Sequence, residues 1–343
     1  MRGNRSLMEA ADADKESGLG MAVSDRSDRG GAPLEVDCVT VYGGEGESET
    51  AVRLQEATLT LAAGEWLTVV GVNGSGKSTL SRLLAGLMPE SMSGVVRRGF
   101  AGDGVSPIVL QQPRAQLFGE TPREEVMFAL EWRGVPAERI SDVTEEALHR
   151  AGLAALADEP WERLSGGQQQ MAAFAAATAY PSPLLVMDEA TSMLDEDNRD
   201  AVMSRARELH ADGTAVVWVT QRLDELGPDD RVVAVGEGRI IYVGRGREFL
   251  YGSADGDSES VSGEAYSGAI GPGTAGRLEA GDVDGEEVSD GGVWPLSPCL
   301  RAGLRLPYLM ELALELRRLG KLSDPLPVTE REWQIVWGNA GNG

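Results

Sequence analysis

Residues 71–79 read GVNGSGKST and predict a phosphate-binding loop: Gly71, four further residues, and then Gly76-Lys77-Ser78. Glycines at this spacing let consecutive backbone N–H groups turn toward phosphate oxygens, and a helix that begins there adds a partial positive charge. Lys77 can reach the β- and γ-phosphates, and the Ser78 hydroxyl can ligate Mg²⁺. We expect a nucleoside triphosphate to be bound by the loop residues Gly71, Asn73, Gly74, Ser75, Gly76, Lys77, Ser78 and Thr79.

The flanking residues predict the elements that such a loop requires. Residues 67–70 (LTVV) are rich in β-branched side chains and predict a strand that enters the loop. Residues 79–87 have the apolar spacing of a helix that leaves it. Strand, loop and helix together distinguish this motif from a chance glycine-rich turn.

Two acidic residues follow another apolar run. Residues 184–187 (LLVM) predict a buried strand, and Asp188-Glu189 stands at its end. Asp188 can hold Mg²⁺ through water, and Glu189 can polarise an attacking water as a general base. Such a pair can also be a solvated strand end, but beside a phosphate-binding loop it predicts hydrolysis.

A second candidate anion site lies at Ser165, Gly166, Gly167 and Gln168, just ahead of an alanine-rich stretch that predicts a helix. The backbone N–H groups at this helix start can receive phosphate oxygens. A single protein chain cannot bring both of these anion sites to the same nucleotide.

Composition narrows the classes of function. The net charge of −24 argues against binding nucleic acid through its phosphate backbone, which needs clustered Lys and Arg. The 343 residues contain no run of 18 apolar residues that would span a membrane, and the N-terminus lacks the apolar region of a signal peptide. The two cysteines, Cys38 and Cys299, have no metal-ligand spacing, and their use suits a reducing cytosol better than a disulfide.

The pattern along the chain predicts four parts. Residues 1–33 resemble a disordered tail, and residues 34–250 alternate strands and helices as an α/β domain does. Within that domain, helices at 122–133 and 141–157 indicate an α-helical subdomain at about 113–180. Residues 251–293 form an acidic, low-complexity linker, most simply a self-solvating spacer, and residues 294–343 a small helical extension with a helix at 307–319.

The phosphate-binding loop, LSGGQ at 164–168 and LLVMDE at 184–189, in this order, resemble the nucleotide-binding subunit of ATP-binding cassette (ABC) transporters. The resemblance covers about residues 34–250. It implies a P-loop NTPase fold of ABC type: a mixed sheet with flanking helices, an α-helical subdomain and an antiparallel β part. It also implies that LSGGQ of one subunit caps the ATP held by the loop of another, so that the chain needs a second ABC ATPase subunit, either itself or a paralogue.

Further positions can be matched to the family one by one. Tyr42 falls where the family stacks an aromatic on adenine, although a strand aromatic packed in the core would look the same. Gln111 matches the glutamine that senses Mg²⁺ and the γ-phosphate, although the neighbouring Gln112 blurs the register. Asp195 in SMLD matches an aspartate that faces the other subunit.

A narrower resemblance is to the ATPase (A) subunits of energy-coupling factor (ECF) transporters. It rests on GEW at 64–66, QLFGETPREEV at 116–126, and the C-terminal stretches GLRLPYLMELALELRRLG and LPVTEREW. The resemblance implies an importer of a vitamin or transition metal, in which the chain lies peripherally on the cytoplasmic face of the membrane. Two A subunits would drive a membrane T subunit, received near residues 111–128, and a substrate-binding S subunit. The helix at 307–319 could equally pack within its own chain.

Two positions depart from the family pattern. Gln221 stands where the family usually has a His that contacts the γ-phosphate, and an amide can donate a hydrogen bond but carries no proton or positive charge. Either Gln221 substitutes for that His, or this half-site is slow and a paralogue supplies the active one. Met171 replaces a basic residue that often follows the LSGGQ motif.

Two other functions remain open at the level of sequence. A soluble ABC ATPase acting on ribosomes or DNA usually has two cassettes or a coiled-coil insert with basic surfaces, which this acidic chain lacks. A mainly regulatory, weakly hydrolysing ABC subunit stays possible because of Gln221. The transported substrate lies outside this chain.

Overall fold

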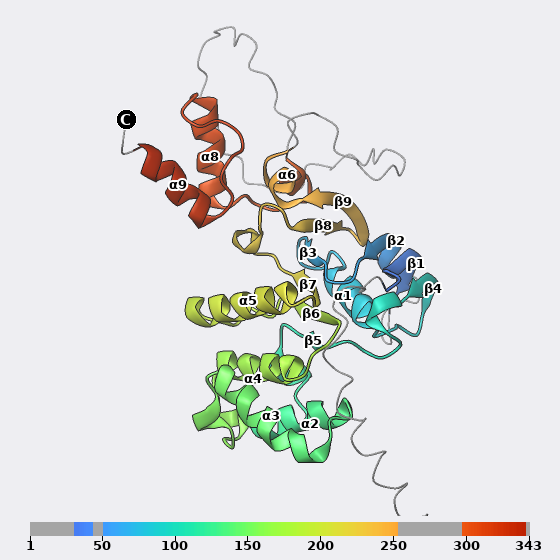
Figure 1. Cartoon of the computed structure of the whole chain (residues 1–343). Helices are drawn as coiled ribbons and strands as arrows, with labels where there is room; N and C mark the ends of the chain where they lie inside the picture. Colours follow the sequence, from blue (N-terminus) through green and yellow to red (C-terminus); the bar gives the residue numbers. More distant parts are fainter. Residues whose placement is uncertain (1–30, 44–50, 253–296, 341–343) are drawn as a thin grey trace, which may run out of the picture.

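The computed structural model describes residues 31–43, 51–252 and 297–340, which form two sheets with helices around them (Figure 1). The predicted tail over 1–33 and the predicted linker over 251–293 lie outside the described residues, apart from residues 31–33, 251 and 252. Residue 251 ends a helix, one residue beyond the predicted end of the cassette domain. In the described part of the chain, no helix has the length and apolar character needed to cross a lipid bilayer.

The larger sheet has six strands in the order β5-β6-β7-β3-β8-β9. All neighbouring pairs are parallel except the hairpin β8/β9. The strands are β3 (Trp66–Val70), β5 (Ile108–Val109), β6 (Leu184–Asp188), β7 (Ala215–Val219), β8 (Arg231–Gly236) and β9 (Arg239–Arg245). The carboxyl ends of β5, β6, β7 and β3 therefore meet at one edge of the sheet, where loops can form a site.

Both faces of the larger sheet are covered. On β7, Val217 and Val219 pack toward the leucines of α1 (Lys77–Ala85), whereas Val216 and Trp218 pack toward α5 (Glu196–Ala211). This explains why the central strands read as unbroken apolar runs rather than as alternating ones.

The smaller sheet is antiparallel, with the order β2-β1-β4. It consists of β1 (Leu34–Tyr42), β2 (Val52–Leu61) and β4 (Met92–Arg97). The first half of β2 pairs with the end of β1, where Val41 lies opposite Leu54. Helix α1 contacts strands of both sheets.

Three helices below the larger sheet lie within the predicted subdomain at 113–180: α2 (Pro122–Trp132), α3 (Ala137–Arg150) and α4 (Gly166–Thr178). The bounds predicted for the second helix, 141–157, were wrong, because α3 spans Ala137–Arg150. α3 begins after Pro136, and Gly152 with its positive φ of 70° ends it. Short 3₁₀ helices occur at Gly99–Ala101, Pro113–Ala115, Ala154–Leu156, Trp161–Arg163 and Leu223–Glu225.

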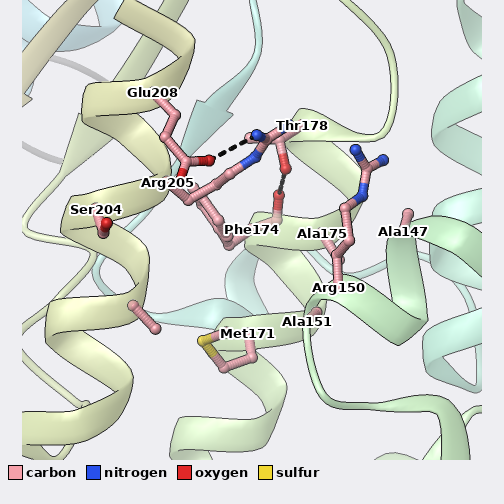
Figure 2. Close-up of a pocket in the computed structure, with 11 residues that line it drawn as sticks. Ala147, Arg150, Ala151, Met171, Phe174, Ala175, Thr178, Ser204, Arg205 and Glu208 are labelled. Atoms are coloured by element: carbon pink, nitrogen blue, oxygen red, sulfur yellow. Dashed lines mark hydrogen bonds and ion pairs between the residues drawn. The ribbon is translucent and has the colours of Figure 1, made fainter.

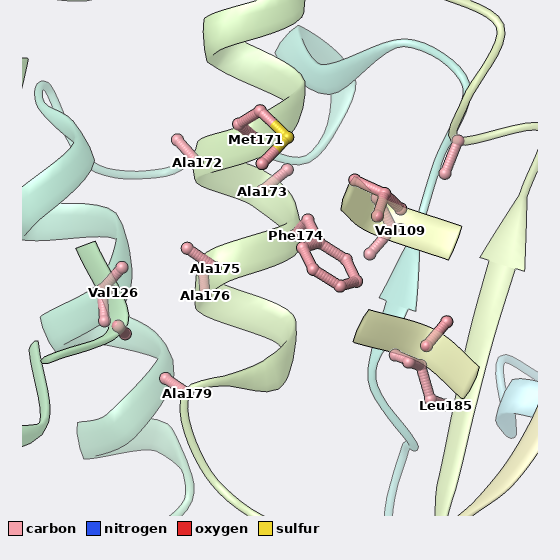
Figure 3. Close-up of a cluster of buried hydrophobic side chains, with 14 of the residues drawn as sticks. Val109, Val126, Met171, Ala172, Ala173, Phe174, Ala175, Ala176, Ala179 and Leu185 are labelled. Carbon is pink, nitrogen blue, oxygen red and sulfur yellow. The ribbon is translucent and has the colours of Figure 1, made fainter. Parts of the chain in front are cut away.

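The alanine-rich helix α4 forms the centre of the subdomain core (Figure 3). Its small side chains let α2 approach on one side, where Val126 lies. Phe174 points to the other side, toward Val109 of β5 and Leu185 of β6. The helical subdomain is thereby packed directly on the strands that end at the candidate site.

The C-terminal helices pack on the cassette rather than standing apart from it. α6 (Gly246–Tyr251), α7 (Pro298–Arg301), α8 (Tyr308–Arg318) and α9 (Glu330–Ala340) follow β9. Cys299, Leu306 and Met310 share one apolar cluster with Val70 of β3. α8 is the helix predicted at 307–319, shorter by one residue at each end.

Candidate functional site

The loop after β3 forms a cradle that only glycine can complete. A Cβ on Gly71 would collide with the carbonyl oxygen of Val235, and one on Gly76 would lie 2.7 Å from the carbonyl of Arg53. Both glycines have positive φ, 153° and 107°. Beside them the hydroxyl of Ser75 is buried and has no hydrogen-bond partner among the described residues, so the cradle contains a polar group that a phosphate oxygen can satisfy.

Lys77 is buried at the floor of this cradle, with 4% of its side chain exposed. Its Nζ donates to the carbonyl of Val72 at 3.0 Å and pairs with Glu189 Oε1 at 3.2 Å. A buried ammonium needs such partners. The oxygens of an incoming phosphate can replace these two partners of the Lys77 ammonium.

Asp188, at the end of β6, is held by hydroxyl groups of α1. Ser78 Oγ donates to Asp188 Oδ1 at 3.2 Å, and Ser81 Oγ donates to Oδ2 at 3.0 Å. Burial raises the pKa of Asp188, and these two hydrogen bonds act in the opposite direction. A buried carboxylate beside a serine hydroxyl is an oxygen donor set that suits Mg²⁺.

Glu189 adopts a left-handed backbone conformation, with φ of 51°, that is uncommon for a non-glycine residue. Its N–H donates to the carbonyl of Val219 on β7 at 2.9 Å. The Nε2 of Gln221 lies 2.7 Å from Glu189 Oε1 and 2.6 Å from Asn73 Oδ1. The structure thus brings the predicted residues Lys77, Glu189, Gln221 and Asn73 into one hydrogen-bonded group.

Gln111 follows β5, next to β6, and is exposed. The preceding residue, Leu110, is fixed on both sides: its N–H donates to Gln116 Oε1 at 2.7 Å, and its carbonyl accepts from Gln170 Nε2 at 2.9 Å. Gln170 belongs to α4. The Gln111 loop is therefore tied to the helical subdomain.

Tyr42 ends β1, is half-buried, and donates its N–H to the carbonyl of Ser91. The residues that follow it, 44–50, lie outside the described ones. Its predicted stacking on adenine stays a prediction.

The LSGGQ residues form a group of their own at the start of α4. Ser165 and Gln168 cap the helix reciprocally: Gln168 N–H donates to Ser165 Oγ at 3.2 Å, and Ser165 N–H to Gln168 Oε1 at 2.8 Å. Gly166 and Gly167 face Met193 and Leu194, just before Asp195. Asp195 accepts from Asn198 N–H at 2.9 Å and so caps α5. The exposed Ser165 and Gly166 are open to a partner.

A groove of about 340 Å³ lies between α3, α4 and α5, and Figure 2 draws the residues that line it. Met171 and Phe174 line it from α4, and the ion pair Arg205–Glu208, at 2.9 Å, lies along α5. Met171, the departure from the family's basic residue, is thus a buried apolar side chain here. None of the predicted nucleotide-binding residues lines this groove.

Sequence reasoning missed Ser81, although its place three residues after Ser78 puts both hydroxyls on one side of α1. It also missed Gln170, which had no signal in the sequence. Within the described residues, no group of three or more His, Cys, Asp or Glu side chains could hold a metal ion.

Comparison with known proteins shows which family this sequence resembles. The family model described as ABC transporter matches residues 54–192. The energy-coupling factor transporter ATP-binding protein EcfA1 of Lacticaseibacillus paracasei is 39% identical over 210 residues, which cover 57% of this chain and 74% of that protein.

Two solved structures share the fold of an ABC cassette. One is cbiO1 of Clostridium perfringens, described as part of the ABC transporter complex cbiONQ, with a TM-score of 0.51, 27% identity, and coverage of 63% of this chain and 89% of that one. The other is the cassette MJ0796, a dimer in a post-hydrolysis state bound to ADP and Pi. It has a TM-score of 0.54, 25% identity, and coverage of 62% and 98%. The predicted fold, a P-loop NTPase of ABC type, is confirmed.

Proposed function

The chain belongs to the ABC transporter family, among the ATP-binding proteins of energy-coupling factor transporters, and we propose that it is the motor subunit of such an importer. It binds ATP and is an ATP hydrolase whose reaction is coupled to transport. The finer assignments of residues, partners and location below are our proposals.

The observation that carries the residue roles is the hydrogen-bonded group of Lys77, Glu189 and Gln221 at the edge of the larger sheet. We propose that Lys77 leaves Glu189 for the β- and γ-phosphates when ATP enters. Glu189 is then free to accept a proton from the attacking water as general base. Gln221 keeps that carboxylate oriented and offers its amide to the γ-phosphate.

Ser78 and Asp188 are the residues that would hold Mg²⁺, and Gln111, which follows β5, would be a further ligand. When bound, the ion neutralises charge on the β- and γ-phosphate oxygens. Ser81 orients Asp188 by occupying its second oxygen. Tyr42 is proposed to stack on the adenine.

We propose that a second cassette, a copy of this chain or a paralogue, completes the site. The Ser165–Gln168 group caps its own helix, and Ser165 and Gly166 are exposed. This group would cover ATP held by the other subunit's loop, with Asp195 at the same interface. The cassette MJ0796, whose structure is dimeric, supports this arrangement.

A membrane partner would dock on three aromatic side chains near the Gln111 loop. Phe118, Phe128 and Trp132 stack on one another, with ring centroids 5.4 and 6.2 Å apart, and are 76%, 41% and 82% exposed. Exposed aromatic side chains in contact with each other mark an interaction surface. We propose that they receive a T subunit, which with a substrate-binding S subunit imports a vitamin or transition metal, while this chain stays peripheral to the membrane.

Co-purification tests this function. The full chain, extracted from its membranes in detergent, is expected to bring an integral membrane protein with it. Phe118→Ser combined with Trp132→Ser should release that protein while ATP binding persists, and Ile241→Ser, also exposed but on β9, should not. The transporter proposal fails if the extracted complexes never contain an integral membrane protein.

A further inference from the structure

Glu225 is a carboxylate buried a short distance behind the proposed catalytic pair. It ends the 3₁₀ helix Leu223–Glu225 that follows Gln221, and only 4% of its side chain is exposed. A buried carboxylate is costly unless hydrogen bonds compensate it. Its partners therefore indicate why this position carries a charge.

The two oxygens of Glu225 bind two different segments of the site. Oε1 accepts from Thr191 Oγ1 at 2.8 Å, and Oε2 accepts from the indole Nε1 of Trp218 at 2.9 Å. Both donors are themselves buried, with Thr191 4% and Trp218 2% exposed. Arg222 is a charged neighbour, and its Nε lies 3.8 Å from Oε1.

Each of these segments carries a residue of the proposed mechanism. Thr191 lies in the turn that starts at Glu189, where Ser192 N–H donates to the Glu189 carbonyl at 3.1 Å. Trp218 precedes Val219, which accepts the N–H of Glu189, and β7 leads directly to Gln221. Glu225 therefore links the turn of Glu189 to the segment of Gln221 through side chains, in addition to the backbone pairing of β6 with β7.

We propose that Glu225 is a positioning residue that holds Gln221 in hydrogen-bond contact with Glu189. Its carboxylate contacts Thr191, Trp218 and Arg222, and it acts through the 2.7 Å contact between Gln221 and Glu189. The inference rests on the proposed roles of those two residues. Without the carboxylate, the bonds to Thr191 and Trp218 are lost, and the direct contact between Gln221 and Glu189 loses their support.

Glu225→Gln is the conservative variant, because its amide can still accept from Trp218 and can donate to the Thr191 hydroxyl. Glu225→Ala removes both bonds. In the full chain within its purified membrane complex, Glu225→Ala should lower kcat for ATP hydrolysis about tenfold or more, because small misplacements of catalytic groups are costly. KM for ATP should change less than about twofold, and Glu225→Gln should retain most of the activity.

The matched control is Asp224→Ala, in the same 3₁₀ helix, where an exposed carboxylate pairs with Arg222. Its kcat should stay within about twofold of wild type, since exposed ion pairs contribute little. Thr191→Val removes one of the two bonds with little change of shape. It should reproduce part of the loss, and it replaces Glu225→Ala if that variant does not fold.

The decisive experiment measures kcat after Glu225→Ala is combined with Gln221→Ala. If Glu225 acts through Gln221, its effect on kcat should largely disappear there. An equal loss in both backgrounds, or kcat unchanged in the single variant, would overturn the inference. If instead Gln221→Ala alone leaves kcat unchanged, the proposed role of Gln221 fails, and the inference fails with it.

Discussion

Glu189 is held by several groups of its own chain before any nucleotide binds. Lys77 and Gln221 both contact Oε1, and its backbone is fixed to β7 in a left-handed conformation. A general base needs its carboxylate oriented and free of strong cationic partners at the moment of reaction. We infer that the phosphates of ATP create that state by drawing Lys77 away.

The proposed roles of Glu189 and Gln221 predict how substitutions at each residue change kcat. Glu189→Gln should retain ATP binding but lower kcat on the order of 10²-fold or more, because the base is lost. Gln221→Ala should also lower kcat, by removing an oriented donor. Gln221→His, which restores the family's residue, should retain or raise kcat.

ATPase rates of the assembled complex and equilibrium binding of ATP to each variant provide the measurements. If Glu189→Gln and Gln221→His both leave turnover unchanged, this subunit's own site does not drive the reaction. A paralogous cassette would then supply the active site, as the replacement of His by Gln221 already allows.

Asp188 is a buried carboxyl group that needs hydrogen-bond donors to remain ionised. Burial raises the pKa of this carboxyl, against the effect of the hydrogen bonds from Ser81 and Ser78. An ionised form kept ready for a divalent cation must be stabilised by neighbouring donors. Ser81 therefore matters to the metal site although it is not itself a proposed ligand.

At the scale of elements, the C-terminal helices are part of the cassette core. Cys299 and Leu306 pack in the same cluster as Val70 and Leu223, which flank the phosphate-binding loop and the Gln221 segment. Gly303 lies against Val72 of the loop: a Cβ added to Gly303 would be 3.6 Å from Val72 Cγ1. This packing predicts that the extension stabilises the nucleotide site from behind.

The two cysteines report on that packing. Cys299 is buried, and burial raises the pKa of its thiol to about 12, whereas Cys38 is exposed. Because the thiolate is the reactive form, native protein should react with a thiol reagent at Cys38 only. Cys299 should become reactive in denaturant. Labelling followed by peptide mass spectrometry checks this, and rapid labelling of Cys299 in the native protein would contradict the packing described here.

Two tryptophans on α9 give a matched test of the extension itself. Trp333 is completely buried beside Ala313 and Leu326, whereas Trp337 is 52% exposed. Trp333→Ala should lower the free energy of unfolding by about 3 kcal/mol, the usual cost of a large core truncation. Trp337→Ala should cost much less. Chemical denaturation of both variants measures the difference, and equal losses would show that α9 is not docked through Trp333.

Sequence patterns predicted elements well where the signal is local. The loop between β3 and α1 and the apolar strand before Asp188 both depend on residues within a few positions of one another. The helix predicted at 141–157 was misplaced because Pro136 and Gly152, rather than apolar periodicity, set its ends. The contacts of Glu225 with Thr191 and Trp218 depend on tertiary packing and gave no pattern in the sequence.

At the scale of the whole molecule, two groups of phosphate-binding type lie on different parts of the fold. The first follows β3 of the larger sheet, and the second begins α4 of the helical subdomain. Both anion sites could be predicted from the sequence, because glycines and a helix start occur at each of them. That they serve nucleotides held by different subunits came from family resemblance, because a single chain contains no partner.

The central claim is that ATP joins two cassettes. The most direct test measures the mass of the purified Glu189→Gln chain, alone and with any cognate paralogue, by light scattering during gel filtration with and without Mg²⁺ and ATP. The account predicts an ATP-dependent dimer that Gly166→Asp abolishes, since a carboxylate at that exposed position would repel phosphate. No nucleotide-dependent association in any combination would contradict it.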